Sequence, residues 1–489
     1  METTPLLTGA HSALKDYEPV KSFKEAKSVF CVESLKMWRI AAPIAFNMLC
    51  QFGVNSVTNI FVGHIGDYEL SAVAISLSVI GTFSFGFMLG MGSALETLCG
   101  QAFGAGQVHM LGVYMQRSFI VLTTFCFILL PIYVFASPIL KLLGQDDDVA
   151  DLAGWFTLLT IPQLFSLAFN FPSSKFLQAQ SKVGVLTWIG IVVFLLHILM
   201  LWVFIYTLRL NLVGAAIAYN ISSWALAIAQ VVYCVGWCKD AWHGLSWAAF
   251  KDIWAFVRLS FASAVMLCLE IWYMMSLTIL TGHLDNAVLA VDSLSICMNF
   301  NGWEGMLFIG INVAISVRVS NELGLGRPRA TKYSVYVTVL QCLVIGLLFM
   351  VIIMVAREHF PVIFTNSKIL QKTVSKYAYI LGVTMVLNSV QPVISGVAVG
   401  AGWQALVAYI NVGCYYIFGL PLGFLLGYRA KLGFMGLWGG MLGGTLLQTL
   451  LLLFVLYKTN WNSEVAQTSE RMRKWGGQDP NIEKVDNGA

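Results

Sequence analysis

Charged residues are scarce in this chain. They make up 11% of its 489 residues, whereas 58% of the residues are hydrophobic. An ordinary soluble domain has roughly 25% charged residues, so the composition excludes soluble and intrinsically disordered proteins. The apolar residues occur in long runs, and a helix that spans a bilayer needs about 20 of them. The composition therefore predicts a polytopic membrane protein.

The chain also lacks the patterns of several other functional classes. Its net charge is only +4 and its basic residues form no continuous tract, so nucleic acid is not an expected partner. The ten cysteines are scattered, and the pair Cys234 and Cys238 has no second pair to complete a metal site. Neither a metal nor a cofactor is expected. Only His197 among the seven histidines lies well inside an apolar run, which argues against a membrane-embedded enzyme.

Apolar runs bounded by charges, Gly and Pro predict twelve membrane-spanning helices. All 29 Lys and Arg can be placed outside these spans or at their edges, as the cost of a cation in the middle of a bilayer requires. The spans are expected near residues 37–62, 70–98, 118–140, 152–172, 184–207, 213–236, 258–281, 288–316, 333–356, 377–399, 405–427 and 434–457.

The two halves of the chain repeat one another, because short matches recur at a nearly constant offset. Each repeat would hold six helices, so the second repeat enters the membrane from the same side as the first. This is a parallel-repeat plan of secondary transporters. The matched residues are Gly104 with Gly324, Gly106 with Gly326, Pro172 with Pro392, and Gly63 and His64 with Gly282 and His283.

The repeat predicts two lobes joined by a linker. An even number of spans places both termini on one side of the membrane. Lys and Arg precede the first span and none follows it before the second, so both termini are expected in the cytoplasm. The expected segments are a cytoplasmic tail (1–36), an N-terminal six-helix lobe (37–236), a cytoplasmic linker (237–257), a C-terminal six-helix lobe (258–457) and a second cytoplasmic tail (458–489).

Four acidic residues lie within the expected spans, and three of them belong to the second repeat. An ionisable residue at bilayer depth is a functional candidate by default. Glu270 and Glu304 are central, whereas Asp292 is near the outer end of its span. These three acids are expected to form an acidic cavity that exchanges protons and binds a competing substrate. Alternatively, Glu270 is a structural acid hydrogen-bonded to Asn or Tyr. For Glu96, near the inner end of its span, a solvated or capping role is at least as favoured as transport.

The first span carries a stripe of neutral amides. Asn47, Gln51, Asn55 and Asn59 recur every four residues, so they share one slowly drifting face. Such amides either line a water-filled cleft or hold helices together, and both interpretations stay open. The candidate cavity-lining residues are Asn47, Gln51, Asn55, Thr58, Tyr273 and Asn299, although aromatic residues in spans are more often packing residues.

Several motifs resemble those of plant MATE (multidrug and toxic compound extrusion, or DETOXIFICATION) transporters. They are Glu96–Gly106, Arg318–Gly324 and Ser395–Gln404, and the segment Leu269–Tyr273 matches as well. The resemblance extends over about 33–460, nearly the whole expected membrane part. The chain is most similar to the vacuolar subgroup, which includes flavonoid-transporting and anion-conducting members.

The resemblance implies a V-shaped pair of lobes with alternating access, proton-coupled export of organic solutes, and a proton- and substrate-responsive role for Glu270. Two positions depart from the family pattern. Thr58 stands where many bacterial members have an Asp, so a proton site in the N-terminal lobe is not expected. Asn388 stands where some plant members have an Asp that partners the glutamate. The loss of that acid favours anionic or neutral solutes over cationic drugs.

The N-terminal tail contains an acidic dileucine pattern formed by Glu2, Leu6 and Leu7. In plants this pattern often directs proteins to the vacuolar membrane, which we expect here, with the plasma membrane as the alternative. The expected function is monomeric proton-coupled antiport of organic solutes such as flavonoid glycosides into the vacuole. The alternative is a channel-like or uniport pathway for inorganic anions such as chloride.

Overall fold

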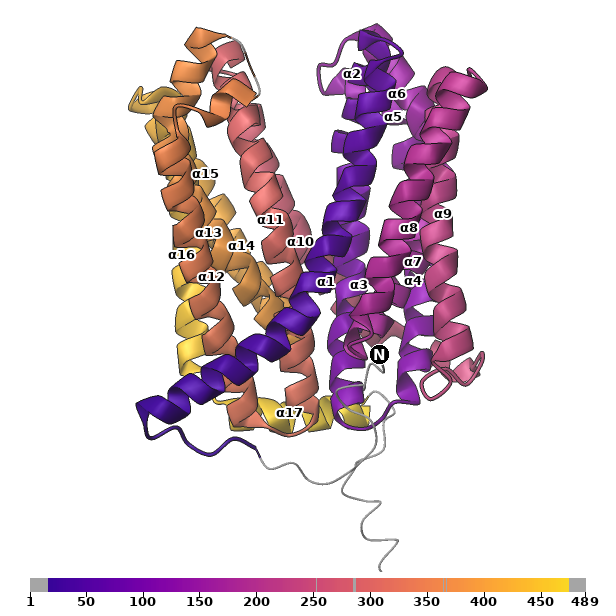
Figure 1. The fold of residues 1–489 in the computed structure, drawn as a ribbon, viewed down its shortest axis with the longest axis vertical. Coiled ribbons are helices and arrows are strands. Elements are labelled where there is room, and N and C mark those ends of the chain that lie inside the picture. The colour runs from indigo at the N-terminus through magenta and orange to yellow at the C-terminus, as the bar shows by residue number, and fades with distance from the viewer. Residues whose placement is uncertain (1–15, 252, 285–286, 364, 366, 475–489) are drawn as a thin grey trace, which may run out of the picture.

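The computed structural model describes residues 16–251, 253–284, 287–363, 365 and 367–474. The elements in these ranges are helices, most of them α-helices with short π-helical or 3-10 segments. Two groups of helices stand side by side (Figure 1). Their ribbons converge at the end that carries α17 and the start of α1, and they diverge toward the opposite end. The protein therefore has the V shape that the resemblance implies.

The first group, here called the N-lobe, occupies one arm of the V. Its largest apolar cluster is formed mainly by α3, α4, α6 and α7. Its elements are α1 (Phe23–Gly63), α2 (Asp67–Ile75), η1 (Ser76–Gly81), α3 (Thr82–Gly104), α4 (Met110–Val134), α5 (Ala136–Leu142), α6 (Asp147–Leu159), α7 (Ile161–Ala179), α8 (Val183–Leu201), η2 (Trp202–Thr207) and α9 (Asn211–Trp237).

The second group, here called the C-lobe, forms the other arm and is followed by a short helix beneath both arms. A 3-10 segment, η3 (Trp247–Phe250), precedes it. Its elements are α10 (Ile253–Thr281), α11 (Ala287–Gly324), α12 (Pro328–Ala356), η4 (Phe360–Ile363), α13 (Lys368–Ala401), α14 (Gln404–Asn411), η5 (Val412–Gly419), α15 (Leu420–Phe424), η6 (Leu425–Arg429), α16 (Gly433–Lys458) and, after the lobe, α17 (Trp461–Lys474).

The number of spans agrees with the sequence-based expectation. Eleven helices among the described residues are long and apolar enough to cross a membrane, and there is a twelfth candidate span if the pair α6 and α7, bent by 50°, counts as one. The bend falls at Thr160, two residues before Pro162, where proline disfavours a continuous helix. The all-helical, polytopic fold is therefore confirmed, and the expected twelve spans agree with the upper count.

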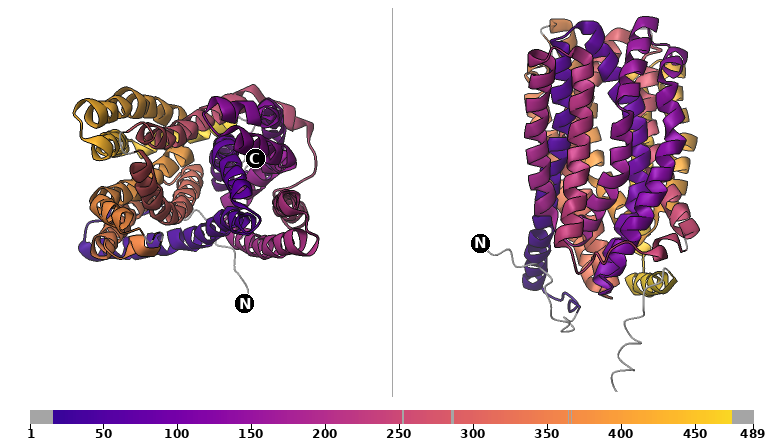
Figure 2. Two further views of the ribbon diagram at one scale, coloured as in Figure 1. Left: turned by 90° about the horizontal axis from the view of Figure 1, so that it is seen from above. Right: turned by 90° about the vertical axis from the view of Figure 1, so that its right-hand side faces the viewer.

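The first helix is longer than hydropathy alone indicates. α1 begins at Phe23, well before the expected span near 37–62, because Ser22 caps it by accepting a hydrogen bond from the Glu25 amide. Pro43 lies inside α1 and removes one backbone donor, which accounts for the bend of this helix in Figure 1. The N-terminal part of α1 is thereby directed under the C-lobe, and the two views of Figure 2 show it projecting along one side of the bundle.

Candidate functional site

Glu270 is half-buried in α10 and is surrounded by neutral hydrogen-bond donors of the C-lobe. Its Oε1 accepts bonds from Gln391 Nε2 at 3.0 Å, from Ser395 Oγ at 3.3 Å and from Asn411 Nδ2 at 3.3 Å. Gln391 and Ser395 lie on α13, and Asn411 ends α14. Among the described residues, no ion pair involves Glu270. The carboxyl is thus held by dipoles and not by a cation.

A second layer of polar contacts orients these donors. Gln448 of α16 donates to Asn411 Oδ1 at 3.1 Å, which turns the amide nitrogen of Asn411 toward Glu270. The same nitrogen also lies 3.3 Å from the Met266 carbonyl oxygen. Three helices, α10, α13 and α14, therefore meet at the carboxyl, and α16 joins them through Asn411, so a change in the charge of Glu270 acts on their packing.

Glu304 lies in α11, 4% exposed, and neither of its carboxyl oxygens has a hydrogen-bond partner in the described residues. No hydrogen bond or ion pair there joins Glu304 to Glu270. Asp292 is exposed near the start of the same helix. The three acids expected to share one cavity thus occupy three different environments, because α11 is long enough to carry its acids at different depths.

The amides of the C-lobe pair with one another. Asn388 on α13 donates to Asn301 Oδ1 on α11 at 3.0 Å. Asn388 also lines a cavity of about 10 Å³ together with Thr384 and Thr445. That volume is at the lower limit for one water molecule, so this interior space does not hold an organic solute in the observed conformation.

Two further candidates have local roles. Tyr273 is buried, its ring stacks on Tyr415 with 4.3 Å between centroids, and its hydroxyl donates to the Met441 carbonyl. It packs between helices in this conformation, and its role in lining a cavity stays a prediction. Asn299 is exposed and accepts a hydrogen bond from the Trp303 indole at 3.2 Å.

The amides of the α1 stripe differ in their surroundings, so they do not all fit one of the two interpretations, a cleft lining or a contact between helices. Asn47 is buried, and its Oδ1 has no partner among the described residues. Asn55 is exposed and accepts a bond from the Tyr219 hydroxyl at 3.0 Å, which ties α1 to α9. Gln51 is half-buried. Asn55 therefore holds helices together, whereas Gln51 forms no hydrogen bond within the part of the chain that the structure describes.

Thr58 is fully buried and is joined to a residue that the sequence singled out separately. Its Oγ1 lies 2.8 Å from Nε2 of His197 on α8, and His197 Nδ1 lies 2.8 Å from Ser222 Oγ on α9. Three helices of the N-lobe are thus linked through one imidazole. Neither residue type nor spacing indicated this contact, since the residues are far apart in sequence.

Glu96 departs from the expectation of a solvated or capping residue. It is 3% exposed in α3 and forms an ion pair with Lys175 of α7, with 2.5 Å between Nζ and Oε2. Lys175 is itself 5% exposed. The expected span near 152–172 stopped short of Lys175, but α7 continues to Ala179 and draws the lysine into the lobe. A buried charge is tolerated there because its partner is adjacent.

The repeated motifs meet where the lobes converge. Gln101 of the N-lobe donates to the Gly400 carbonyl at 3.0 Å, and Thr97 donates to the Val399 carbonyl at 2.5 Å. A Cβ at Gly104 would overlap the backbone oxygen of Asn321, and one at Gly324 would overlap that of Gln101. The two matched glycines therefore let the backbones of the repeats touch.

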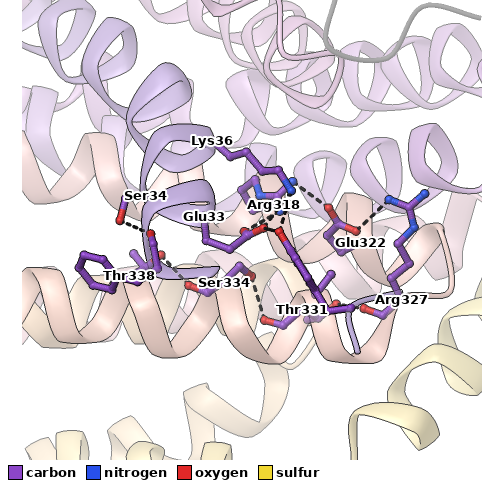
Figure 3. A network of polar contacts seen from close by, with 12 residues as sticks. Glu33, Ser34, Lys36, Arg318, Glu322, Arg327, Thr331, Ser334 and Thr338 are labelled. Carbon is purple, nitrogen blue, oxygen red and sulfur yellow. Dashed lines mark hydrogen bonds and ion pairs between the residues drawn. The ribbon is translucent and has the colours of Figure 1, made fainter. Parts of the chain in front are cut away.

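A charged network lies at the same end and joins α1 to the C-lobe (Figure 3). Arg318 of α11 contacts Glu33 of α1 at 2.7 Å and Glu322 at 2.8 Å. Lys36 and the Tyr17 hydroxyl also bind Glu33, at 2.9 Å and 2.6 Å. Burial and the hydrogen bond to Glu33 raise the pKa of the Tyr17 phenol, so it stays neutral. Tyr17 and the N-terminal part of α1 are thereby fastened to the C-lobe.

The amphipathic helix α17 contacts both lobes below their junction (Figure 1). Arg471 Nη1 donates to Gln101 Oε1 of α3 at 2.9 Å and to the Ala401 carbonyl of α13 at 3.1 Å. Gly402 ends α13 with φ of +83°, and a Cβ there would lie 2.6 Å from Arg471. Burial lowers the pKa of this guanidinium, and Glu464 counteracts the effect. α17 therefore bridges the two lobes.

Comparison with known proteins identifies the family. The sequence model of the MatE family matches residues 43–203 and 262–425, which is more than half of the chain. The chain belongs to the MATE family of transporters. Protein DETOXIFICATION 35 of Arabidopsis thaliana is 72% identical over 475 residues, which cover 97% of each chain. Protein DETOXIFICATION 34 of the same plant is 62% identical over 99% of this chain and 90% of its own length.

A solved structure supports the same assignment. The eukaryotic MATE transporter AtDTX14 superposes with a TM-score of 0.86 at 32% identity, covering 91% of this chain and 99% of that chain. These relatives are plant MATE transporters and not enzymes, as the sequence indicated. The expected plant MATE family is therefore confirmed.

Sequence reasoning found Glu270 but missed the residues around it. Gln391, Ser395 and Asn411 are neutral and come from other helices, so charge at bilayer depth did not mark them. One signal was available, because Ser395 begins a motif that resembles the family. Lys175 was missed for the opposite reason, since it was placed outside the expected span.

Proposed function

We propose that this MATE transporter exchanges protons for organic solutes, with Glu270 as the residue that binds the proton and responds to substrate. The supporting observation is the set of three neutral donors on one carboxyl oxygen. Neutral donors stabilise the ionised carboxyl without neutralising it, so a proton or a substrate group can compete for it.

The other polar candidates take supporting roles in this proposal. Glu304 supplies a second buried carboxyl, and Asn388 with Asn301 presents amide groups to a solute in a more open state. Asp292 is exposed near the start of α11 and would exchange protons with the open side. The proposed solutes are flavonoid-like or other amphiphilic compounds, and the proposed unit is a monomer.

The test is uptake by the full-length protein in sealed proteoliposomes with an imposed pH gradient. Quercetin 3-glucoside serves as the probe, and Glu270→Gln mimics the protonated carboxyl permanently at nearly the same volume. We expect this variant to reach the membrane but to lose pH-driven uptake, whereas Glu270→Asp keeps part of it. Glu358→Gln, at an exposed loop glutamate, is the matched control. Uptake by Glu270→Gln at the wild-type rate would refute the role of Glu270.

A channel-like or uniport pathway for chloride is the second candidate. It is favoured by the Asn388–Asn301 pair, because amide N–H groups bind anions without a proton. The same liposomes distinguish the two functions. Chloride flux that is large and unaffected by the pH gradient supports the second function, whereas solute uptake that follows the gradient supports the first.

We further propose the vacuolar membrane as the site of action, with the plasma membrane as the alternative and with both termini in the cytoplasm. The sorting residues Glu2, Leu6 and Leu7 lie outside the described residues. Replacement of both leucines by Ala is expected to move a tagged protein away from the vacuolar membrane. An unchanged location would assign no role to the pattern, and protease protection of both terminal tags would overturn the orientation.

A further inference from the structure

The imidazole of His197 lies at the centre of a hydrogen-bond chain to which the proposed function assigns no role. It is 0% exposed and lies between Thr58 of α1 and Ser222 of α9, each at 2.8 Å from one ring nitrogen. Thr58 is also 0% exposed and Ser222 is 2% exposed. Both hydroxyls lie within hydrogen-bond distance of a backbone carbonyl as well, at 2.8 Å to Val54 and 2.7 Å to Ala218.

The number of available hydrogens determines which protonation states of the ring this hydrogen-bond chain can satisfy. Each hydroxyl has one hydrogen and two lone pairs. When both hydroxyls donate to their carbonyls, only lone pairs face the ring, and both ring nitrogens must then carry hydrogen. That ring is the charged imidazolium.

The neutral ring is satisfied by one small change. One hydroxyl turns its hydrogen from its carbonyl to the bare ring nitrogen, and the other still accepts from the ring N–H. The carbonyl that is released keeps its helical N–H bond. On protonation the proton joins the bare nitrogen, and the hydroxyl hydrogen returns to the carbonyl. Both protonation states therefore leave no polar atom of the chain unpaired.

We propose that His197, held between Thr58 and Ser222, is a proton-binding residue of the N-lobe that acts during transport. The inference rests on the proposed proton-coupled function. It assigns to the N-lobe a titratable group of its own, separate from Glu270. Because α1, α8 and α9 all contact the ring, a change in the charge of the ring alters the packing of these three helices.

The surroundings provide no charged partner for the ring. The segments of α1 after Pro43, of α8 with η2, and of α9 contain no Asp, Glu, Lys or Arg. Desolvation thus opposes the imidazolium, while the two acceptors support it. The other titratable residues in or directly after these segments are Cys50, His64, Tyr206, Tyr219, Tyr233, Cys234 and Cys238.

A polar contact extends from the ring toward the surface of the lobe. The Tyr219 ring packs edge-on against the imidazole with 6.3 Å between centroids, and its hydroxyl donates to Asn55. Asn55 is exposed. Tyr219 therefore connects the imidazole to an exposed amide of the N-lobe.

The direct test observes the ring itself and does not depend on transport. Full-length protein labelled with ¹⁵N-histidine is reconstituted in phosphatidylcholine liposomes, and imidazole ¹⁵N resonances are recorded by solid-state NMR between pH 7.5 and pH 4.5. The resonances missing from His197→Gln identify the residue. We expect them to move from neutral imidazole to imidazolium within this range. Resonances that stay neutral to pH 4.5 would overturn the proposal, whatever the outcome for Glu270→Gln.

Two hydroxyl variants keep the test valid if His197→Gln folds poorly. Thr58→Val and Ser222→Ala each remove one acceptor from the imidazolium, and each is expected to lower the midpoint of the NMR change by about one pH unit. An unchanged midpoint in both variants would contradict the donor count.

Transport provides the second readout. In the uptake assay with quercetin 3-glucoside, His197→Gln is expected to lose the part of the pH dependence that lies in the NMR range. His359→Gln, at an exposed histidine of the C-lobe, is expected to keep it. A wild-type pH profile in His197→Gln would show that the ring titrates without a part in transport and would refute the proposed role. If wild-type uptake ignores pH altogether, the proposed function fails separately.

Discussion

The glutamates that lie within the expected spans are held in opposite ways in the two lobes. In the N-lobe, Glu96 is in direct contact with Lys175, and both side chains are almost fully buried. In the C-lobe, Glu270 is bonded only to neutral groups, and Glu304 has no partner among the described residues. A paired carboxylate is fixed in its ionised form, because loss of its charge would leave a buried lysine alone. A carboxyl with neutral partners can change its charge at much lower cost.

The difference assigns different tasks to the lobes at their glutamates. The Glu96–Lys175 pair joins α3 to α7 and helps to keep the N-lobe rigid near the junction with the C-lobe. The Glu270 carboxyl lies where α10, α13 and α14 of the C-lobe meet, so in the proposed function a proton there would alter the packing of these helices. The following variants test this division, beginning with the largest expected effect.

Removal of one partner of the N-lobe pair is expected to be severe. Lys175→Met leaves Glu96 buried without a cation, which costs about 3–5 kcal/mol when a buried pair is broken. Thermal unfolding of the purified protein measures the loss. The double variant Lys175→Met with Glu96→Gln removes both charges and is expected to recover most of the stability. Equal loss in the single and double variants would mean that shape, not charge, holds the two helices together.

Removal of the link between lobes is expected to have an intermediate effect. Arg471→Met deletes two charge-assisted bonds, to Gln101 and to the Ala401 carbonyl, each worth about 1.5–3 kcal/mol. The junction should then open more often. Ser320→Cys, buried at the junction, reports opening through its rate of reaction with a water-soluble maleimide, in a Cys31→Ser background that removes the exposed cysteine.

A matched control separates the link from a general loosening of α17. Arg473 lies on the same helix and is exposed, so Arg473→Met is expected to leave the labelling rate of the introduced thiol unchanged. If both arginine variants raise the rate equally, α17 does not act through Arg471.

Replacement of Glu304, whose carboxyl has no partner among the described residues, is expected to change stability in the opposite direction. Glu304→Leu replaces a buried group that lacks hydrogen bonds with an apolar group, so it is expected to stabilise the protein by about 1–3 kcal/mol. The same unfolding assay measures the gain. If this gain accompanies a loss of uptake, Glu304 is retained for function at the expense of stability. A loss of stability would indicate that the carboxyl is satisfied after all, for example by buried water.

The fold could be predicted because the features that determine it are visible in the sequence. Long apolar runs set the spans, and the matched glycines at Gly104 and Gly324 revealed the repeat. Hydropathy did not reveal the polar start of α1 or helix α17, because both are helical without being apolar. It also placed Lys175 outside its span, since a one-dimensional pattern does not show a buried partner.

The candidate site was only partly predictable for a physical reason. A charge at bilayer depth is unusual, so Glu270 stands out in the sequence alone. Its donors are common neutral residues, and they gain meaning only when α10, α13 and α14 are brought together. The same holds for Thr58 and His197, which were noted separately and are joined only by the packing of α1 on α8.

The smallest effect is expected when a single hydrogen-bond donor to the Glu270 carboxyl is removed. Ser395→Ala removes one of three bonds to its carboxyl and leaves the other two, so transport should persist. Loss of a donor disfavours the ionised carboxyl, and a neutral hydrogen bond is worth about 1 kcal/mol. The midpoint of pH-driven uptake should therefore rise by about half to one pH unit. Ser389→Ala, on the same helix, removes a buried hydroxyl that donates only to the Val386 carbonyl and should leave the midpoint unchanged. Equal midpoints in the two variants would indicate that the proton is bound elsewhere, and a shift confined to Ser395→Ala would place it at Glu270.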